Sequence, residues 1–400
     1  MRPNRRVSAL SFSATLALDA RAKALAAAGR DVINMSVGEP DFKTPEPVRK
    51  AAAAKAESGE VRYTPAAGTV SLRQAIAERL TLTRGIPFTE QEVTVCHSAK
   101  HALSGACITL IEPGDEVLLL LPAWVSYDEI VKFAGGVPVP VPSRADCGPD
   151  LDAIRRAITK KTRGILVNSP CNPSGYVMTQ AEIRGISAIA VERDLWIVSD
   201  EIYRRLVYEG EPDFSPAQVS PEVRARTVVV DGASKAFAMT GYRIGYVAAP
   251  QPVAKAVAAL HSQLTGCPNA VSQTAFEAAL RNEPPEVASM VKEFDKRRRV
   301  LVEGLKRLGL SVPWPRGAFY AFPDVSPYID ERGSAGFCDD LLEEQNLAVV
   351  PGSAFGVDDH VRLSYATSIG NIEKAVERFG KFLASRKAKP AGTSGVGRRA

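Results

Sequence analysis

Residues 227–248, TVVVDGASKAFAMTGYRIGYVA, place two short apolar runs on either side of a small-residue segment that carries a lysine and an arginine. Such almost entirely apolar runs are typical of strands that are buried on both faces of a sheet. Helical patterns separate this pair from four similar runs, and the six together are residues 93–96, 116–121, 164–168, 195–199, 227–230 and 244–248. The alternation predicts an α/β fold with a mainly parallel, doubly wound sheet.

The pattern changes after residue 285. Apolar residues recur at helical spacing over residues 286–308, which predicts one long amphipathic helix leaving the sheet domain. Shorter apolar runs at 318–322, 348–350 and 361–364, with a helix near 336–345, predict a smaller α+β domain. We therefore expect a large domain at 46–284, a small domain from 13–45 with 285–385, a flexible arm at 1–12 and a disordered tail at 386–400.

Composition excludes several classes of protein. The chain is 45% hydrophobic, but no apolar stretch approaches the roughly 20 residues of a membrane span, so we expect no membrane insertion. Eight basic residues in the two terminal segments exceed the net charge of +5, so the body is slightly acidic and nucleic-acid binding is disfavoured. Six cysteines without a C-x-x-C pair argue against a disulfide framework or zinc ribbon. We expect a cytoplasmic protein with no metal.

The segment between the last two runs carries distinctive chemistry. Lys235 lies soon after a buried strand, and Arg243 follows eight residues later, with small residues such as Ser234 between them. A nearby fixed cation lowers the pKa of an amine, which favours a Schiff base with an aldehyde. Arg243 offers planar donors for a phosphate. Alone, Lys235 would be read as a solvated loop lysine. No G-x-G-x-x-G motif follows any run, which disfavours a nicotinamide enzyme.

Several strings give the chain a family resemblance from about residue 13 to about residue 382. The chain resembles the class I/II aminotransferases, the fold type I pyridoxal-phosphate (PLP) enzymes, and most of all a bacterial aspartate aminotransferase subgroup whose members also include prephenate users. The strings are SVGEPDF (36–42), WVSY (124–127), FAGG (133–136), VSDEIY (198–203), KAFAMTGYRIGY (235–246) and VRLSYA (361–366). Together and in this order they are far more specific than any one of them.

The resemblance implies a role for each residue around the cofactor ring. Lys235 carries the cofactor and moves the proton, and Asp200 pairs with the ring nitrogen. Tyr203 and Asn172 donate to the 3-oxygen, and Trp124 stacks on the ring. Each has an ordinary local alternative: a strand-end carboxylate, a packed tyrosine, an Asn-Pro turn and a core tryptophan. Cys171 lies beside these residues without an assigned role.

The same resemblance implies a phosphate site. Ser98, Ala99 and Lys100 begin a helical run, where backbone N–H groups and the helix dipole favour an anion. Ser98 could equally be a plain N-cap. Ser234 and Arg243 would complete the site within the chain. Tyr63 would reach the phosphate of the other subunit, which implies a homodimer with shared active sites.

Substrate contacts follow from the resemblance in the same way. Arg362 would hold the α-carboxylate, with Gly38, Trp124 and Asn172 contributing. Lys100 would meet the distal carboxylate of aspartate, glutamate or prephenate. Ser13 and Thr15 would assist it.

The expected activity is ping-pong transamination through a Schiff base, between an amino acid, aspartate or glutamate in the first place, and a 2-oxo acid. The acceptors would be 2-oxoglutarate and oxaloacetate, with prephenate as a further candidate. Three alternatives stay open: a carbon–sulfur lyase on the same fold, a broad-specificity aromatic or alanine-type aminotransferase, and a regulator. The regulator would need a DNA-binding segment, and the residues before Ser36 are too few for one.

Overall fold

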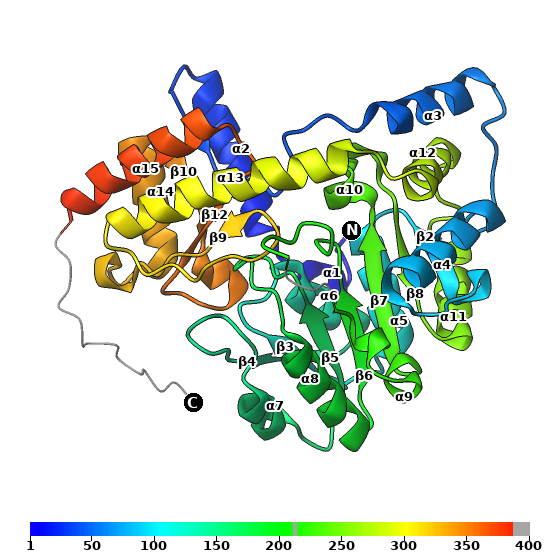
Figure 1. The fold of residues 1–400 in the computed structure, drawn as a ribbon. Helices are drawn as coiled ribbons and strands as arrows, with labels where there is room; N and C mark the ends of the chain where they lie inside the picture. The colour runs from blue at the N-terminus through cyan, green and yellow to red at the C-terminus, as the bar shows by residue number, and fades with distance from the viewer. Residues whose placement is uncertain (211–213, 387–400) are drawn as a thin grey trace.

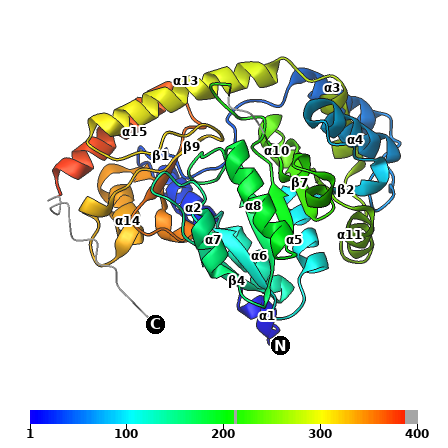
Figure 2. The same cartoon turned by 60° about the horizontal axis from the view of Figure 1, so that its bottom comes forward.

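The computed structural model describes residues 1–210 and 214–386 of the 400-residue chain. A seven-stranded sheet with helices on both faces forms the larger part, and a smaller α+β part lies beside it (Figure 1). The long helix α13 (Glu286–Arg307) spans both parts, as Figure 2 also shows. Among the described helices, none combines the length and the hydrophobicity that a membrane span requires.

The large sheet has the strand order β2-β8-β7-β6-β5-β3-β4, and β8 runs in the direction opposite to the other six strands. The predicted mainly parallel α/β sheet is therefore confirmed. The strands are β2 (Val93–Cys96), β3 (Glu116–Leu120), β4 (Val137–Val141), β5 (Thr162–Asn168), β6 (Trp196–Asp200), β7 (Thr227–Gly232) and β8 (Gly245–Ala248).

The edge strand β4 was missed by the sequence analysis. Its sequence, VPVPV, contains two prolines, which cannot donate to a ladder and are confined to edges or bulges. β4 pairs with β3 on one side only, so its other side needs no donors. The six predicted runs all form strands, with ends that shift by one or two residues.

Alternate residues of the strands pack against different helices. Val117 and Leu119 of β3 belong to the cluster that includes α5 (Ala99–Leu110) and α6 (Ser126–Ala134). Leu118, between them, packs with α7 (Leu151–Ala157) and α8 (Gln180–Glu192). Because side chains alternate across a strand, α5 and α6 cover one face and α7 and α8 the other. This double coverage explains why the runs are apolar throughout.

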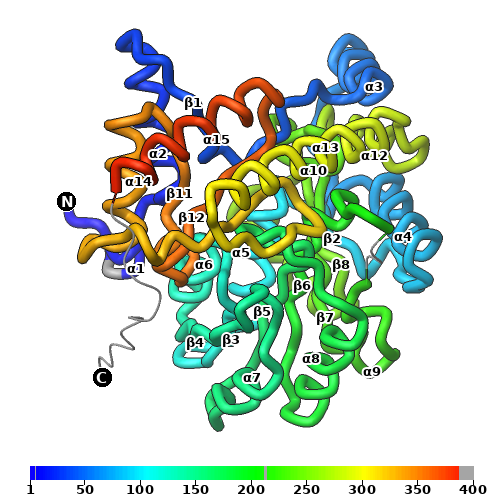
Figure 3. Tube along the Cα trace, turned by 60° about the vertical axis from the view of Figure 1, so that its left-hand side comes forward, coloured from blue at the N-terminus to red at the C-terminus, as the bar shows by residue number. Residues whose placement is uncertain are grey.

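The smaller part joins both ends of the described chain. Strand β1 (Ile33–Asn34) pairs in parallel with β10 (Leu347–Ala348), and α2 (Ala14–Ala27) lies beside α14 (Gly333–Gln345) (Figure 3). A second sheet has the order β11-β12-β9, with β9 (Tyr320–Ala321), β11 (Val350–Pro351) and β12 (Val361–Ser364).

The α-helices of the whole described chain that have not yet been named are α1 (Arg5–Ser8), α3 (Glu46–Glu57), α4 (Val70–Arg84), α9 (Pro221–Arg224), α10 (Ala233–Ala236), α11 (Gln251–Leu264), α12 (Ala270–Arg281) and α15 (Ile369–Ala384).

Two expectations for this part need correction. The single strand expected at 348–350 is wrong, because β10 and β11 belong to different sheets and are separated at Val349. Arg386, expected in the disordered tail, forms an ion pair with Asp340 at 2.7 Å. The rest of the predicted tail, residues 387–400, lies outside the described residues. Within the predicted arm, α1 contacts α6, and the Ser11 N–H donates to Glu129.

Candidate active site

A cavity of about 350 Å³ opens where the parallel strands end, between the large sheet and the smaller part. Ligands of doubly wound sheets bind at this edge. Every site residue expected from the sequence lines it except Tyr63: Ser13, Thr15, Gly38, Ser98, Ala99, Lys100, Trp124, Asn172, Asp200, Tyr203, Ser234, Lys235, Arg243 and Arg362. These residues come from segments up to 349 positions apart in the chain, so the fold assembles the cavity.

Lys235 lies on α10, the short helix that follows β7. Its Nζ donates a hydrogen bond to the carbonyl oxygen of Gly38. Burial lowers the pKa of the Lys235 amine to about 8, and the cations Arg362 and Arg243 act in the same direction, against Glu39 and Asp200. A substantial fraction of this amine is therefore neutral near physiological pH and able to act as a nucleophile or base.

Asp200 is the last residue of β6 and is 4% exposed. Its Oδ2 accepts a hydrogen bond from the Tyr127 hydroxyl at 2.7 Å, and its Oδ1 accepts one from the Ile202 N–H at 3.2 Å. Burial raises the pKa of the Asp200 carboxyl to about 6 despite these donors. Within residues 1–210 and 214–386, no lysine or arginine forms an ion pair with it. A buried carboxylate without a cation favours a ligand that supplies one.

The start of α5 has groups that suit an anion, whereas Asp200 suits a cation. Ser98 is the N-cap of this helix, and its hydroxyl accepts a hydrogen bond from the His101 N–H at 3.2 Å. Arg243 adopts a left-handed backbone conformation (φ 52°) and donates to the Thr240 carbonyl at 2.8 Å. Gly245 lets β8 approach this turn, because a Cβ there would lie 2.5 Å from the Ala99 nitrogen. The helix start and Arg243 together suit an anion.

Arg362 enters the cavity from β12 and is 2% exposed. Its guanidinium donates to Asn172 Oδ1 at 2.9 Å and to the Ser36 carbonyl, and it lies 4.5 Å from the centre of the Tyr320 ring. The buried Nε has no hydrogen-bond partner among the described residues. Both acceptors of this guanidinium are neutral, so its positive charge in the lining of the cavity suits an anionic ligand.

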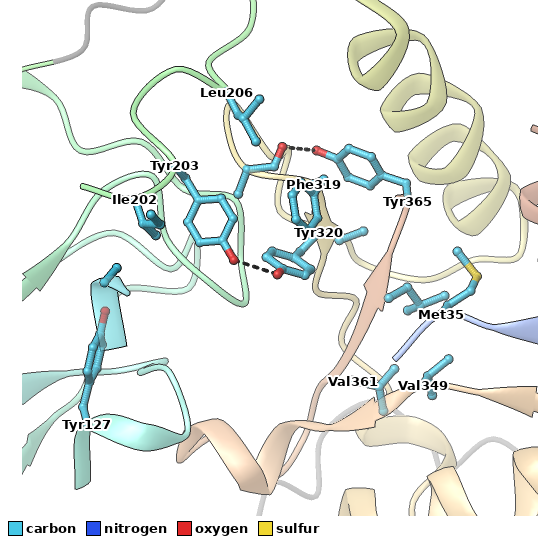
Figure 4. Close-up of a cluster of buried hydrophobic side chains, with 14 of the residues drawn as sticks. Met35, Tyr127, Ile202, Tyr203, Leu206, Phe319, Tyr320, Val349, Val361 and Tyr365 are labelled. Carbon is cyan, nitrogen blue, oxygen red and sulfur yellow. Dashed lines mark hydrogen bonds between the residues drawn. The ribbon is translucent and has the colours of Figure 1, made fainter. Parts of the chain in front are cut away.

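Two tyrosines that line the cavity are joined by a hydrogen bond between their hydroxyl groups. Tyr203 and Tyr320 are 2.8 Å apart at their hydroxyl oxygens, and Figure 4 shows this bond joining the loop after β6 to β9. Gly38 packs directly on this pair, because a Cβ there would lie 2.6 Å from the Tyr320 hydroxyl. The bond holds both rings in place beside Lys235, whose Nζ lies 6.0 Å from the centre of the Tyr203 ring.

Lys100 is a further cationic residue in the lining of the cavity. Lys100 occupies the first turn of α5, and its Nζ lies 4.9 Å from the centre of the Trp124 ring. Burial, followed by the charge of Arg243, lowers the pKa of Lys100. Ser13 and Thr15 share a hydrogen bond of 2.8 Å at the N-cap and start of α2. They reach the cavity from the smaller part, as the sequence analysis expects.

Tyr63 is the exception. It is 99% exposed and lies outside the cavity of its own chain. A contribution to the site could come only through another copy of the chain, which is the arrangement that the resemblance implies. Its role stays a prediction.

Other residues that line the cavity were not singled out from the sequence. Tyr127 and Tyr320 hold Asp200 and Tyr203, and Asn168 donates from Nδ2 to the Asp200 carbonyl at 3.0 Å. Glu39 accepts a hydrogen bond from Thr240 at the entrance. Tyr127 ends the quoted string WVSY, and Asn168 ends β5, four residues before Asn172. Nothing in the local sequence around Tyr320 marks it.

Comparison with known proteins identifies the family. The model of the family described as "Aminotransferase class I and II" matches residues 30–379. The chain belongs to this family. It is 45% identical over 385 residues to the aspartate/prephenate aminotransferase of Thermus thermophilus, covering 95% of this chain and 98% of that one. It is 40% identical over 392 residues to the aspartate aminotransferase of Geobacillus stearothermophilus, covering 96% and 100%.

Solved structures give the same answer. An aspartate aminotransferase from Thermus thermophilus with maleate superimposes with a TM-score of 0.92 at 44% identity, covering 96% of this chain and all of that one. The aspartate aminotransferase from Rhizobium meliloti has a TM-score of 0.92 at 37% identity, covering 97% and 100%. The class I/II aminotransferase fold is thus confirmed. Members of the family are PLP enzymes, so this chain is a PLP-dependent aminotransferase.

The cavity fits PLP by its own chemistry. PLP combines an aldehyde, a basic ring nitrogen and a phosphate. The cavity offers a buried amine at Lys235 and a buried carboxylate without a cation at Asp200. Arg243 and the start of α5 offer N–H donors that can bind a phosphate. Trp124 supplies an aromatic face.

The lowered pKa of Lys235 predicts how the cofactor-free protein takes up PLP. The neutral amine is the nucleophile, so the fraction able to react increases as pH is raised through about 8 and falls below it. We expect the rate of PLP capture, followed by stopped-flow absorbance, to increase with a midpoint near pH 8. A midpoint near 10.5, the ordinary lysine value, would contradict the effect of burial.

Proposed function

We propose that this aminotransferase moves the amino group between an acidic amino acid, aspartate or glutamate, and a 2-oxo acid. The acceptors are 2-oxoglutarate and oxaloacetate, with prephenate as a further acceptor. The observation that carries this proposal is the presence of two cationic side chains, the buried Arg362 and the exposed Lys100, in the lining of the cavity that also holds Lys235. A dicarboxylate needs two cationic partners, and relatives with 40–45% identity are named for aspartate.

Lys235 transfers the proton. When bound, PLP supplies the aldehyde that captures the substrate amine and a ring that withdraws electrons from Cα. The Lys235 amine would take the proton from the substrate Cα as a general base and would deliver it, as a general acid, to the C4′ carbon of the cofactor, so that the amino group stays with the cofactor. A pKa of about 8 suits both directions, because neither protonation state dominates strongly near neutral pH.

Asp200 holds the positive charge of the ring nitrogen. Its carboxylate is buried and fixed by Tyr127 and the Ile202 N–H, so it is already oriented when the cofactor binds. At the other end, we propose that Ser98, Ala99, Ser234 and Arg243 bind the phosphate.

Arg362 binds the α-carboxylate of the substrate. Its contact with Asn172 fixes the guanidinium plane and uses Asn172 Oδ1, so Asn172 is left with its Nδ2 to donate. The guanidinium lines the cavity, where it can meet the incoming carboxylate. Gly38 allows the chain to pass close to this point.

Lys100 sets the preference for acidic side chains. We expect Lys100→Ala to lower kcat/KM for aspartate by about 10²-fold, because a partly buried carboxylate loses its cation. For alanine and phenylalanine the change should stay within about 5-fold, since neither has a distal carboxylate. Steady-state kinetics with the three donors measures both. Equal losses for all three would assign Lys100 to the cofactor and not to substrate choice.

We also propose that the active unit is a homodimer in which Tyr63 of one chain contacts the phosphate bound by the other. Its full exposure in one chain supports this proposal, because an aromatic side chain with 99% exposure has no packing role there. Sedimentation equilibrium should give twice the mass of 42.9 kDa. An active monomer would contradict the shared site.

All six cysteines are free thiols, which supports a cytoplasmic enzyme, and cell fractionation tests this.

A panel of amino donors tests the function directly. Aspartate with 2-oxoglutarate, glutamate with oxaloacetate, and either donor with prephenate should react at higher kcat/KM than alanine or phenylalanine with the same acceptors. The main competing activity is elimination, which releases pyruvate and ammonia from a single amino acid. Pyruvate formation in the absence of any oxo-acid acceptor would therefore favour a lyase.

A further inference from the structure

Three of the four histidines of this chain lie close together, beside the cysteine that ends β2. The rings of His101 and His261 stack with centroids 4.1 Å apart, and the His97 ring lies 5.1 Å from that of His101. Cys96, His101 and His261 come from β2, α5 and α11, which pack against one another (Figure 1). The fourth histidine, His360, lies elsewhere, against Phe322.

The ligand atoms of this group converge. One atom each from Cys96, His101 and His261 lies within 4.8 Å of the others. Zinc–sulfur bonds of about 2.3 Å and zinc–nitrogen bonds of about 2.0–2.1 Å place ligands roughly 3.3–3.8 Å apart in a tetrahedral site. Binding would require a contraction of about 1 Å and a rotation of the stacked His101 and His261 rings, because imidazole lone pairs lie in the plane of the ring.

The ring nitrogens of His261 and His101 have few hydrogen bonds among the described residues. His261 is 1% exposed, and neither its Nδ1 nor its Nε2 has a hydrogen-bond partner among the described residues. Leaving such atoms unpaired costs about 1–3 kcal/mol each, a cost that a phenylalanine or leucine would avoid. The contacts of His101 are weak: its Nδ1 accepts one long bond of 3.3 Å from the His97 N–H.

We propose that Cys96, His101 and His261 bind a thiophilic transition-metal ion of the Zn²⁺ type. Thiolate and imidazole are the ligands that Zn²⁺ prefers. The Cys96 thiol donates only a weak bond to the Thr94 carbonyl at 3.4 Å. On binding, Cys96 Sγ releases one proton to solvent and forms the metal–sulfur bond, the two imidazoles each contribute a lone pair, and no electron is transferred. Water takes the fourth position, and the partly exposed His101 provides the route of entry.

The position of this site connects it to the active site. Cys96 and His101 bracket Ser98, Ala99 and Lys100, the turn that lines the cavity. An ion held by both would restrain this turn from behind. The sequence analysis expected no metal, because the ligand spacing lacks a C-x-x-C pair and His261 lies 160 residues beyond His101.

Metal content tests the proposal without reference to activity. The holoenzyme is treated with a chelator, dialysed and titrated with Zn²⁺ against a chromophoric competitor; Co²⁺ is used in parallel for its thiolate charge-transfer band. We expect one ion per chain, a thiolate band with Co²⁺, and one proton released per ion in buffers of different ionisation enthalpy. Cys96→Ala, His101→Gln and His261→Gln should each weaken binding at least about 100-fold.

Matched variants control for burial and residue type. Cys107→Ala removes a buried thiol from α5, the helix that also carries His101. His360→Gln removes the one histidine outside the group of three. Both variants should bind Zn²⁺ as the wild type does. His101 is only partly buried, so His101→Gln remains informative if the variants at Cys96 or His261 do not fold. Less than one ion per chain at micromolar Zn²⁺, a cobalt complex without the thiolate band, or equal affinity in all variants would overturn the proposal.

Discussion

Lys235→Ala is expected to lower kcat/KM with aspartate by at least about 10⁴-fold. Two functions are lost together: the amine that holds the cofactor covalently, and the base that moves the Cα proton. The other lysines that line the cavity among the described residues have different partners: Lys23 pairs with Asp19, and Lys100 lies over the Trp124 ring. Steady-state kinetics at saturating PLP measures the loss.

A second readout separates chemistry from folding. Borohydride should attach the cofactor irreversibly to the wild-type chain at Lys235, as mass spectrometry of peptides would show, and should leave Lys235→Ala unlabelled. Lys255→Ala, on the exposed side of α11, is the matched control and should retain both labelling and activity. A Lys235→Ala variant with wild-type turnover would end the proposed role of this residue.

The sheet could be predicted because its strands are covered on both faces. Strands such as β5 and β7 are buried along nearly their whole length, so their sequences contain few polar residues and stand out as runs. β4 escaped because an edge strand has no such requirement and tolerates prolines. The split between β10 and β11 escaped for another reason. Val349 continues the apolar run while the backbone changes sheets, and hydrophobicity does not record which neighbour a strand pairs with.

The site could be predicted where its residues follow strand ends. Asp200 and Lys235 come directly after buried runs, and a doubly wound sheet brings such positions together. Residues that act by supporting others were harder to find. Tyr127 reaches Asp200 across 73 positions and Tyr320 reaches Tyr203 across 117, and a tyrosine in a helix or short strand has no local feature that reveals its partner. The histidine group was missed for the same reason, since only folding joins α11 to α5.

Asp200→Asn is the second variant with a large expected effect. Asparagine keeps the shape and can still accept from the Tyr127 hydroxyl, but it cannot neutralise a protonated ring nitrogen. Loss of one preoriented electrostatic partner in a buried site costs about 10²–10³-fold in kcat. We expect a loss of this size in kcat, with KM for aspartate changed by less than about 5-fold, because Arg362 and Lys100 remain in place.

Tyr127→Phe distinguishes the charge of Asp200 from its hydrogen bond. This variant keeps the carboxylate but removes the donor that lowers its pKa, so the pKa of Asp200 in the cofactor-free protein should increase from about 6. A hydrogen bond to a charged group is worth about 1.5–3 kcal/mol, but only the part of it that is gained in the transition state changes kcat, and the charge of Asp200 remains. We therefore expect less than about a 10-fold loss in kcat. If Tyr127→Phe and Asp200→Asn were equally impaired, orientation would matter and the charge would not, because only the second variant removes it.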